Sequence, residues 1–151
     1  MTMNERNGAT SGPCNFWAVA QMAKIQFIGG NEVLLEMALR SGTETVEEAV
    51  KAGAELLKTY TYNKGRAMGV KRTGDTLGAL TVKTPKRGKD GWVCYVTYTG
   101  LNRKGNRNAE VAFINEYGKR GQPARPFNRL ALENGEQAVI QRMEDTLLKS
   151  D

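Results

Sequence analysis

Histidine is absent from this 151-residue chain, and cysteine occurs only twice, as Cys14 and Cys94. Without histidine, the chain can form neither a Ser/His/Asp triad, nor a Cys/His nucleophile, nor the usual zinc sites. One cysteine lies in a polar leader and the other in an expected strand, so we expect both to be reduced rather than part of a disulfide framework. The composition therefore argues against an enzyme, and we expect no catalytic residue, metal ligand or cofactor.

Other signatures of chemistry are missing too. Residues 100–106 carry two glycines five apart but lack the Lys and Ser/Thr with which a P-loop grips phosphate and magnesium. The carboxylate pair Glu47-Glu48 falls on the polar face of an expected helix, where solvation explains it. No apolar run approaches the ~20 residues that a membrane helix needs. We therefore expect no membrane partner.

The first 20 residues are poor in regular structure signals. Ala18-Val19-Ala20 mimics a signal-cleavage site, but no adequate apolar segment precedes it, so we reject a signal peptide. Residues 1–20 are expected to form a flexible leader. Phe16 and Trp17 could anchor this leader on the body of the protein or on a neighbouring subunit, and a frayed terminus is the alternative.

What is present describes one basic globular domain. The hydrophobic content is 40% and the charged content 25%, and the length suits a single domain, expected at 21–151. The formal net charge is +6, which favours nucleic acid, anionic lipid or an acidic protein surface as a partner. The alternative is a basic face that only interacts with solvent. The positive residues are spread out except between Lys83 and Arg129.

The first half of the chain predicts a strand and two helices. Residues 23–28 alternate as a short strand. Asn31 suits the N-cap of a following helix, which Gly42 can close. Two successive capping boxes, at 41–44 and 45–48, leave the start of the next helix uncertain by one turn. This helix is expected to end near residues 62–63, with one buried stripe: Val46, Ala49, Val50, Gly53, Leu57 and Tyr60.

After a basic loop at 64–75, the pattern changes to strands. Residues 79–84 and 92–99 alternate and are rich in β-branched and aromatic residues, so they predict a β-hairpin whose cationic turn spans 85–91. On its second strand one face carries Trp92, Cys94, Val96 and Tyr98. The opposite face carries Val93, Tyr95 and Thr97, and its apolar content predicts that it is at least partly covered, with a neighbouring subunit as one candidate.

The last third of the chain predicts helices. Residues 109–116 fit either a strand or a helix, and we favour about two helical turns. Residues 126–148 predict a long C-terminal helix with Leu132, Val139, Met143 and Leu147 on its stripe, and Asn134-Gly135 could kink it. The expected fold is α+β: a small antiparallel sheet, made of the hairpin and the N-terminal strand, packed against two to three helices.

The segment 113–132 organises these elements. A short apolar element ends in Glu116-Tyr117-Gly118, a basic loop follows at 119–122, and Arg125-Pro126-Phe127 opens the last helix. Proline suits the first helical position because its fixed φ fits and its missing N–H would have no partner there. We expect Phe127 to enter the core from the first turn.

This order of motifs resembles the head–tail joining proteins (neck, or tail-completion, proteins) of long-tailed bacteriophages. Earlier segments match the family in the same order: a short strand and glycine at 25–30, and a Gly-Ala stretch at 51–55. A Thr-Gly-x-Leu motif follows at 73–77, with one extra residue here. The resemblance covers about residues 23–148, and residues 1–20 have no counterpart in it.

The resemblance implies a structural role in the virion. Subunits of the family assemble as a ring, here expected to be a hexamer or dodecamer, in the neck between portal and tail, and DNA passes through the lumen. The implied partners are other copies of the chain, the portal with its adaptor or stopper, and the tail terminator or tube proteins. Synthesis would take place in the host bacterial cytoplasm. No catalytic residues carry over.

The positively charged loops are the candidate contacts with an acidic neighbouring ring or with DNA in the lumen. They are glycine-containing and free of large apolar side chains, so we expect them to act in assembly rather than in folding. The candidates are Lys86, Arg87, Lys89, Arg103, Lys104, Arg107, Lys119 and Arg120. The alternative function is a small basic module that binds nucleic acid without sequence specificity, because no helix-turn-helix or RNA-binding motif is visible. Loops that only add solubility are a further alternative.

Overall fold

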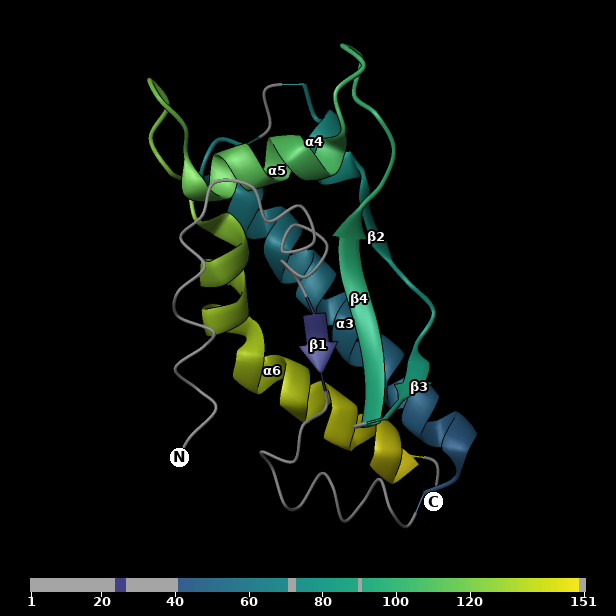
Figure 1. The fold of residues 1–151 in the computed structure, drawn as a ribbon. Coiled ribbons are helices and arrows are strands. Elements are labelled where there is room, and N and C mark those ends of the chain that lie inside the picture. Colours follow the sequence, from purple (N-terminus) through teal and green to yellow (C-terminus); the bar gives the residue numbers. More distant parts are fainter. Residues whose placement is uncertain (1–23, 27–40, 71–72, 90, 150–151) are drawn as a thin grey trace, which may run out of the picture.

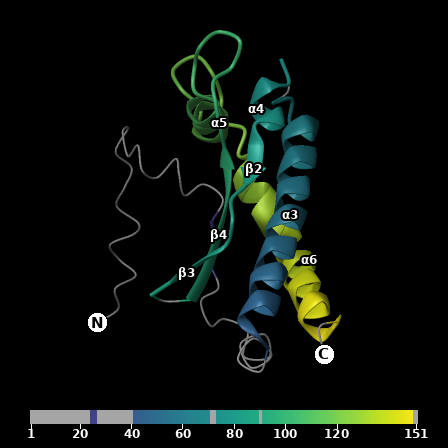
Figure 2. The ribbon, with the colours of Figure 1, turned by 90° about the vertical axis from the view of Figure 1, so that its right-hand side faces the viewer.

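The computed structural model describes residues 24–26 by their backbone, and residues 41–70, 73–89 and 91–149 in full. Within these residues the fold is α+β, as expected: a small antiparallel sheet lies on two long helices, α3 (Thr43–Ala67) and α6 (Phe127–Lys149) (Figures 1 and 2). The expected leader at 1–20 and the expected helix after Asn31 lie outside the described residues. No helix in the described part of the chain is long and apolar enough to span a membrane.

The sheet is built around β4 (Gly91–Tyr98). The strand β1 (Lys24–Gln26) pairs with it antiparallel, and so do β2 (Leu80–Val82) and β3 (Lys86–Gly88). Because β1 and β3 both pair with Val93, they must lie on opposite edges of β4. The N-terminal strand and the hairpin predicted from the sequence are therefore confirmed as parts of one sheet.

The hairpin is longer than predicted. Residues 85–91 were expected to form a turn, but Lys86 pairs with Val93 and Arg87 with Trp92, so the turn is confined to the residues between Gly88 and Gly91. Between the Val82–Val96 and Lys86–Val93 pairs, the first strand has one residue more than its partner, which defines a β-bulge. Pro85 lies in this bulge, where its missing N–H costs no ladder hydrogen bond. The bulge explains why the pattern appeared to end at Thr84.

The long helix α3 starts and ends differently from the prediction. Its N-cap is Gly42, so the helix begins at neither Ser41 nor Thr45, the N-caps expected for the two predicted capping boxes. The helix continues to Ala67, about one turn beyond the expected end. Its buried stripe is largely as expected, except that Tyr60 is half-buried and that Ala54, Thr61 and Gly65 join it.

The C-terminal helix α6 packs along α3 with a different stripe from the predicted one. Leu132 is 47% exposed, so placing it on the stripe was wrong. The buried positions recur every fourth residue: Phe127, Ala131, Gly135, Val139, Met143 and Leu147. The predicted kink is not needed to explain Gly135, because the helix runs through it and a Cβ there would lie 3.0 Å from the Tyr60 ring. Glycine at this position lets the two helices approach closely.

Two short helices close one end of the molecule. The residues 73–77 were expected to lead straight into a strand, but Asp75–Gly78 forms a helical turn, α4, after Gly74 in a left-handed conformation. The ambiguous segment is helical, as favoured: α5 spans Asn108–Tyr117 and is longer than the two turns expected. Both helices lie at the end of the sheet where β4 finishes (Figure 1).

Candidate assembly surfaces

The Glu-Tyr-Gly and Arg-Pro-Phe motifs meet in one buried junction. Glu116, on the last turn of α5, is only 5% exposed. Its Oε2 accepts hydrogen bonds from the backbone N–H (2.8 Å) and side-chain amide (3.2 Å) of Asn128, and its Oε1 accepts one from the backbone N–H of Arg129 (3.0 Å). These N–H groups belong to the first turn of α6, which has no partners for them within the helix. Glu116 thus caps α6 from another helix, and a carboxylate also suits the positive end of the helix dipole.

The junction continues into the sheet through Tyr98. The Tyr98 hydroxyl donates a 2.6 Å hydrogen bond to Oδ1 of Asn128, and its ring packs edge-to-face on Phe127 with centroids 6.4 Å apart. Burial raises the pKa of Tyr98 well above its ordinary value, so the hydroxyl remains a donor. Phe127 is fully buried, as predicted. The sheet, α5 and α6 are therefore joined at one point. Tyr98 and Asn128 take part in this junction, although the sequence did not predict it.

The loop between the two motifs is a tight turn with a specific glycine. Gly118 has a φ of +78°, and a Cβ there would lie 2.8 Å from the backbone nitrogen of Ala124 and 2.9 Å from the Gln122 carbonyl oxygen. Lys119 and Gln122 exchange two backbone hydrogen bonds. Pro126 immediately precedes α6 instead of occupying its first position, and its carbonyl accepts the bond from Leu130. Arg125 reaches back to the Gly69 carbonyl oxygen at 3.2 Å.

The eight candidate cations divide between opposite ends of the molecule. Lys86, Arg87 and Lys89 lie at the end of the hairpin where β4 begins, and the other five lie on the loops at the end where β4 finishes (Figures 1 and 2). All eight are exposed. Lys86 and Arg87 belong to β3 and not to a turn, so their positions are set by strand pairing. The charged loops, which form one basic region in the sequence, therefore make two separate surfaces in the structure.

The loop 100–107 is more ordered than its composition suggests. Oδ1 of Asn102 accepts hydrogen bonds from the backbone N–H groups of Lys104 (2.9 Å) and Asn106 (3.0 Å). Nε of Arg103 lies 3.2 Å from Oδ1 of Asp75, and its backbone N–H also reaches the same carboxylate. These contacts position Arg103 locally, but its 74% exposed side chain makes the ion pair weak, so a role in assembly rather than in folding remains the prediction for this loop.

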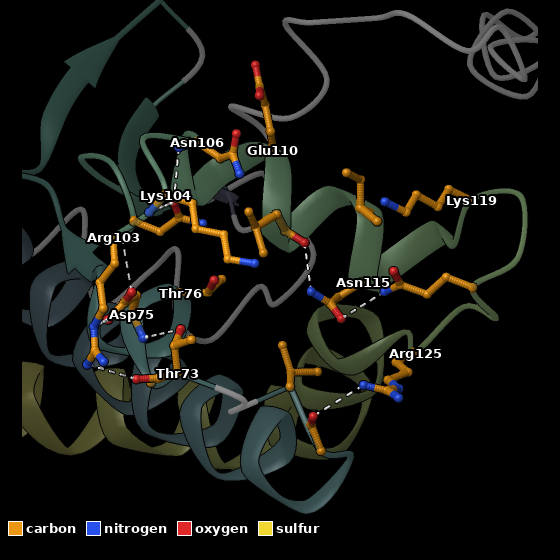
Figure 3. Close-up of a pocket in the computed structure, with 17 residues that line it drawn as sticks. Thr73, Asp75, Thr76, Arg103, Lys104, Asn106, Glu110, Asn115, Lys119 and Arg125 are labelled. Atoms are coloured by element: carbon orange, nitrogen blue, oxygen red, sulfur yellow. Dashed lines mark hydrogen bonds and ion pairs between the residues drawn. The ribbon is translucent and has the colours of Figure 1, made fainter.

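A groove of about 750 Å³ lies between these loops, α4 and α5 (Figure 3). Lys104 and Lys119 extend their ammonium groups into it from opposite sides, while Arg103 and Arg125 are turned towards their partners on Thr73–Asp75 and Gly69. Apolar side chains also line the groove: Val111 and Ile114 from α5, and Val70 from the segment after α3. Three predicted cations are thus brought together around one concave surface. Arg107 and Arg120 do not line it.

The described residues hold no cluster of metal ligands, and Cys94 is the one cysteine among them. No group of three or more Cys, Asp or Glu side chains in this part of the chain could hold a metal ion. Cys94 is buried and donates its thiol hydrogen to the Lys83 carbonyl at 3.1 Å, and burial raises its pKa to about 11. The thiol is therefore protonated at neutral pH and is a poor nucleophile.

Comparison with family models, curated proteins and solved structures found no match for this chain.

Proposed function

We propose that this chain is a structural virion protein, a subunit of an oligomeric ring in the neck of a long-tailed bacteriophage. In this role it joins the DNA-filled head to the tail, and DNA passes through the ring. The observation that carries the proposal is the junction at Glu116. The two motifs on which the family resemblance mainly rests are bound to each other through the carboxylate and the first turn of α6.

The arrangement of the charged loops supports the same proposal. A neck component has one neighbour towards the head and another towards the tail, so it needs two separate binding surfaces. Here basic loops occupy both ends of the sheet, and rigid elements hold them apart. Complementary charge favours specific association and a rapid encounter with an acidic partner.

The proposal is tested by assembly. Mass photometry of the full chain, alone and with portal and tail proteins of the same phage, should reveal a ring-sized oligomer, and electron microscopy of joined particles should place it in the neck. A chain that stays monomeric in every mixture and is missing from purified virions would contradict the proposal. The rotational symmetry of the particle would distinguish a hexamer from a dodecamer.

A second candidate function is non-sequence-specific binding of nucleic acid. It is favoured by the cations gathered at one end of the molecule: Arg103, Lys104, Lys119 and Arg125. Each phosphate contact releases counterions, so duplex affinity should fall steeply as salt rises. A salt titration with the isolated chain separates the two functions, because tight, salt-sensitive duplex binding by the monomer favours the second.

A further inference from the structure

The groove beside α5 combines charge with apolar surface. Among the described residues that line it, the cations are Arg103, Lys104, Lys119 and Arg125 and the acids are Asp75 and Glu110, so four positive charges face two negative ones. The Arg103–Asp75 pair is internally neutralised. Figure 3 shows the Glu110 carboxylate turned away from the groove. Of the charged side chains that the structure describes in the groove, the ammonium groups of Lys104 and Lys119 are therefore the ones left for a ligand.

These two lysines are available to a ligand. Neither side chain has a hydrogen bond or ion pair to any residue that the structure describes, and both are exposed. Each extends from a loop whose backbone is held by hydrogen bonds, to Asn102 on one side and between Lys119 and Gln122 on the other. The backbone that carries each lysine is thus held on its own side of the groove. A ligand with two separate carboxylates can therefore bind both ammonium groups at once.

The floor of the groove favours a peptide over a nucleic acid. Val111 and Ile114 are half-buried on α5, and Val70, which also lines the groove, is buried. A phosphodiester backbone gains nothing from such a surface, since its affinity comes from cations along its track. Apolar side chains of a peptide would remove this surface from water. The side-chain amide of Asn106, at the rim, can also bond a peptide backbone.

We propose that this groove is the docking site for a short acidic segment with apolar side chains, supplied by a neighbouring protein of the particle. Its carboxylates bind Lys104 and Lys119, and its apolar side chains pack on Val111 and Ile114. Only the identity of the partner rests on the proposed neck function. Binding itself belongs to the isolated chain, so a failure of one can be distinguished from a failure of the other.

The test is fluorescence anisotropy with labelled probes and the full chain. The main probe is a short peptide that alternates glutamate and leucine. Its matched controls are a peptide with glutamine in place of glutamate, an oligo-glutamate of the same length, and a DNA duplex. We expect the glutamate–leucine peptide to bind more tightly than all three.

Two charge-matched variants locate the site. Lys104→Ser with Lys119→Ser removes two positive charges at the groove, and Lys86→Ser with Lys89→Ser removes two at the other end of the molecule. The groove variant should bind the peptide on the order of tenfold more weakly, while the distant variant should change affinity by less than about twofold. Both should unfold at the wild-type denaturant midpoint, because all four side chains are exposed.

A third variant tests the apolar contact. Val111→Thr keeps the side-chain shape but places a hydroxyl in the apolar lining of the groove. It should therefore weaken binding of the glutamate–leucine peptide and leave the affinity for oligo-glutamate unchanged. Equal losses from both lysine pairs, or equal binding of the two acidic peptides, would overturn the proposal. Preferential duplex binding would instead identify a nucleic-acid site, and self-association abolished by the groove variant would identify a second copy of this chain as the occupant.

Discussion

At the scale of single residues, Glu116 decides how the chain's two main motifs meet. A carboxylate buried without a cation is unusual, because burial of a charge is costly unless hydrogen bonds compensate. Here three donors from the first turn of α6 provide that compensation. The same bonds satisfy N–H groups that the helix leaves unpaired. The Glu116 carboxylate and the N–H groups at the start of α6 therefore offset each other's cost of desolvation.

Removing the Glu116 carboxylate should destabilise the fold. Glu116→Ala leaves buried donors on Asn128 and Arg129 without their acceptor, so we expect the free energy of unfolding to fall by about 2–4 kcal/mol in urea denaturation. Glu116→Gln, which keeps one acceptor oxygen, should lose less. The control is Glu136→Ala on the exposed face of α6, which should change stability by less than about 0.5 kcal/mol. A similar effect from both alanine variants would show that the cap contributes nothing.

Of the two aromatic residues in the Glu-Tyr-Gly and Arg-Pro-Phe motifs, Phe127 should be the more sensitive to substitution. It is fully buried, beside Tyr98 and Gly65, so Phe127→Ala should cost about 3–5 kcal/mol through lost burial and the cavity left behind. Tyr117, at 64% exposure, is the comparison, and Tyr117→Ala should cost about 1 kcal/mol or less. Chemical denaturation measures both. An unchanged denaturant midpoint for Phe127→Ala would contradict the buried position of Phe127.

Gly118 requires glycine for two reasons, its positive φ and the close approach of other backbone atoms, and a comparison with Gly121 separates them. Gly118→Ala would place a Cβ against backbone atoms of Ala124 and Gln122 as well as straining φ, so we expect a loss of about 2–4 kcal/mol. Gly121 has nearly the same φ, +79°, but open space around its Cβ position, and Gly121→Ala should cost only the conformational term of about 1–2 kcal/mol. Equal losses in thermal or urea unfolding would mean that the close contact is relieved without cost.

At the scale of elements, the packing of α3 on α6 sets the shape of the domain. Buried residues recur every fourth position on α6 and along most of α3, which is the arrangement in which i±4 ridges of two helices interdigitate. Glycines lie at close approaches along this contact. A Cβ at Gly53 would lie 2.8 Å from Cγ of Met143, and one at Gly65 would lie 3.1 Å from Cδ2 of Phe127. The helix pair therefore depends on small residues as much as on large apolar ones.

Substitutions at Gly53 should show this dependence. Gly53→Leu forces a large side chain against Met143 and Val139, and should cost about 1–3 kcal/mol. Gly53→Ala should be close to neutral, because the flexible end of Met143 can move and alanine improves helix propensity by about 1 kcal/mol. Lys51→Leu adds the same leucine to an exposed position of α3 and is the control. Comparable unfolding midpoints for the two leucine variants would contradict close packing at Gly53.

At the scale of the whole molecule, the structure divides the basic region into two surfaces. Six candidate cations lie on the hairpin and on the 100–107 loop, at opposite ends of β4. A role in joining two neighbours therefore becomes testable one end at a time. The side chains of Lys86, Arg87 and Lys89 have no hydrogen bond or ion pair to any residue that the structure describes, whereas Arg103 is paired with Asp75.

Two triple variants test these ends separately. Lys86, Arg87 and Lys89 are changed to serine in one, and Arg103, Lys104 and Arg107 in the other. Each should remain folded, with the second losing about 0.5–1 kcal/mol from the Arg103–Asp75 pair. Under the proposed function, each should lower the yield of joined, infectious particles in a complementation assay, at a different joining step. Normal yields from both would establish that the loops serve solubility alone.

The sequence by itself determined the elements whose signal is local. Strict periodicity identified α3, α6 and β4, and the composition of the hairpin and the N-terminal strand identified the α+β class. Phe127 could be placed in the core because a large apolar residue at the start of a helix has few other stable positions. The errors at this level were also local: the bulge at Pro85 concealed β3, and the helical turn α4 was too short to produce a periodic signal.

Only the tertiary structure decided which distant residues act together. Glu116, Asn128 and Tyr98 form one network although they come from α5, α6 and β4, and no spacing rule relates a carboxylate to the end of another helix. Leu132 is exposed because the four-residue repeat of α6, set by its contact with α3, turns the stripe away from it. The charged loops lie at opposite ends because β4 separates them. The distances between such residues depend on how the elements pack, and the spacing of residues along the chain does not give that packing.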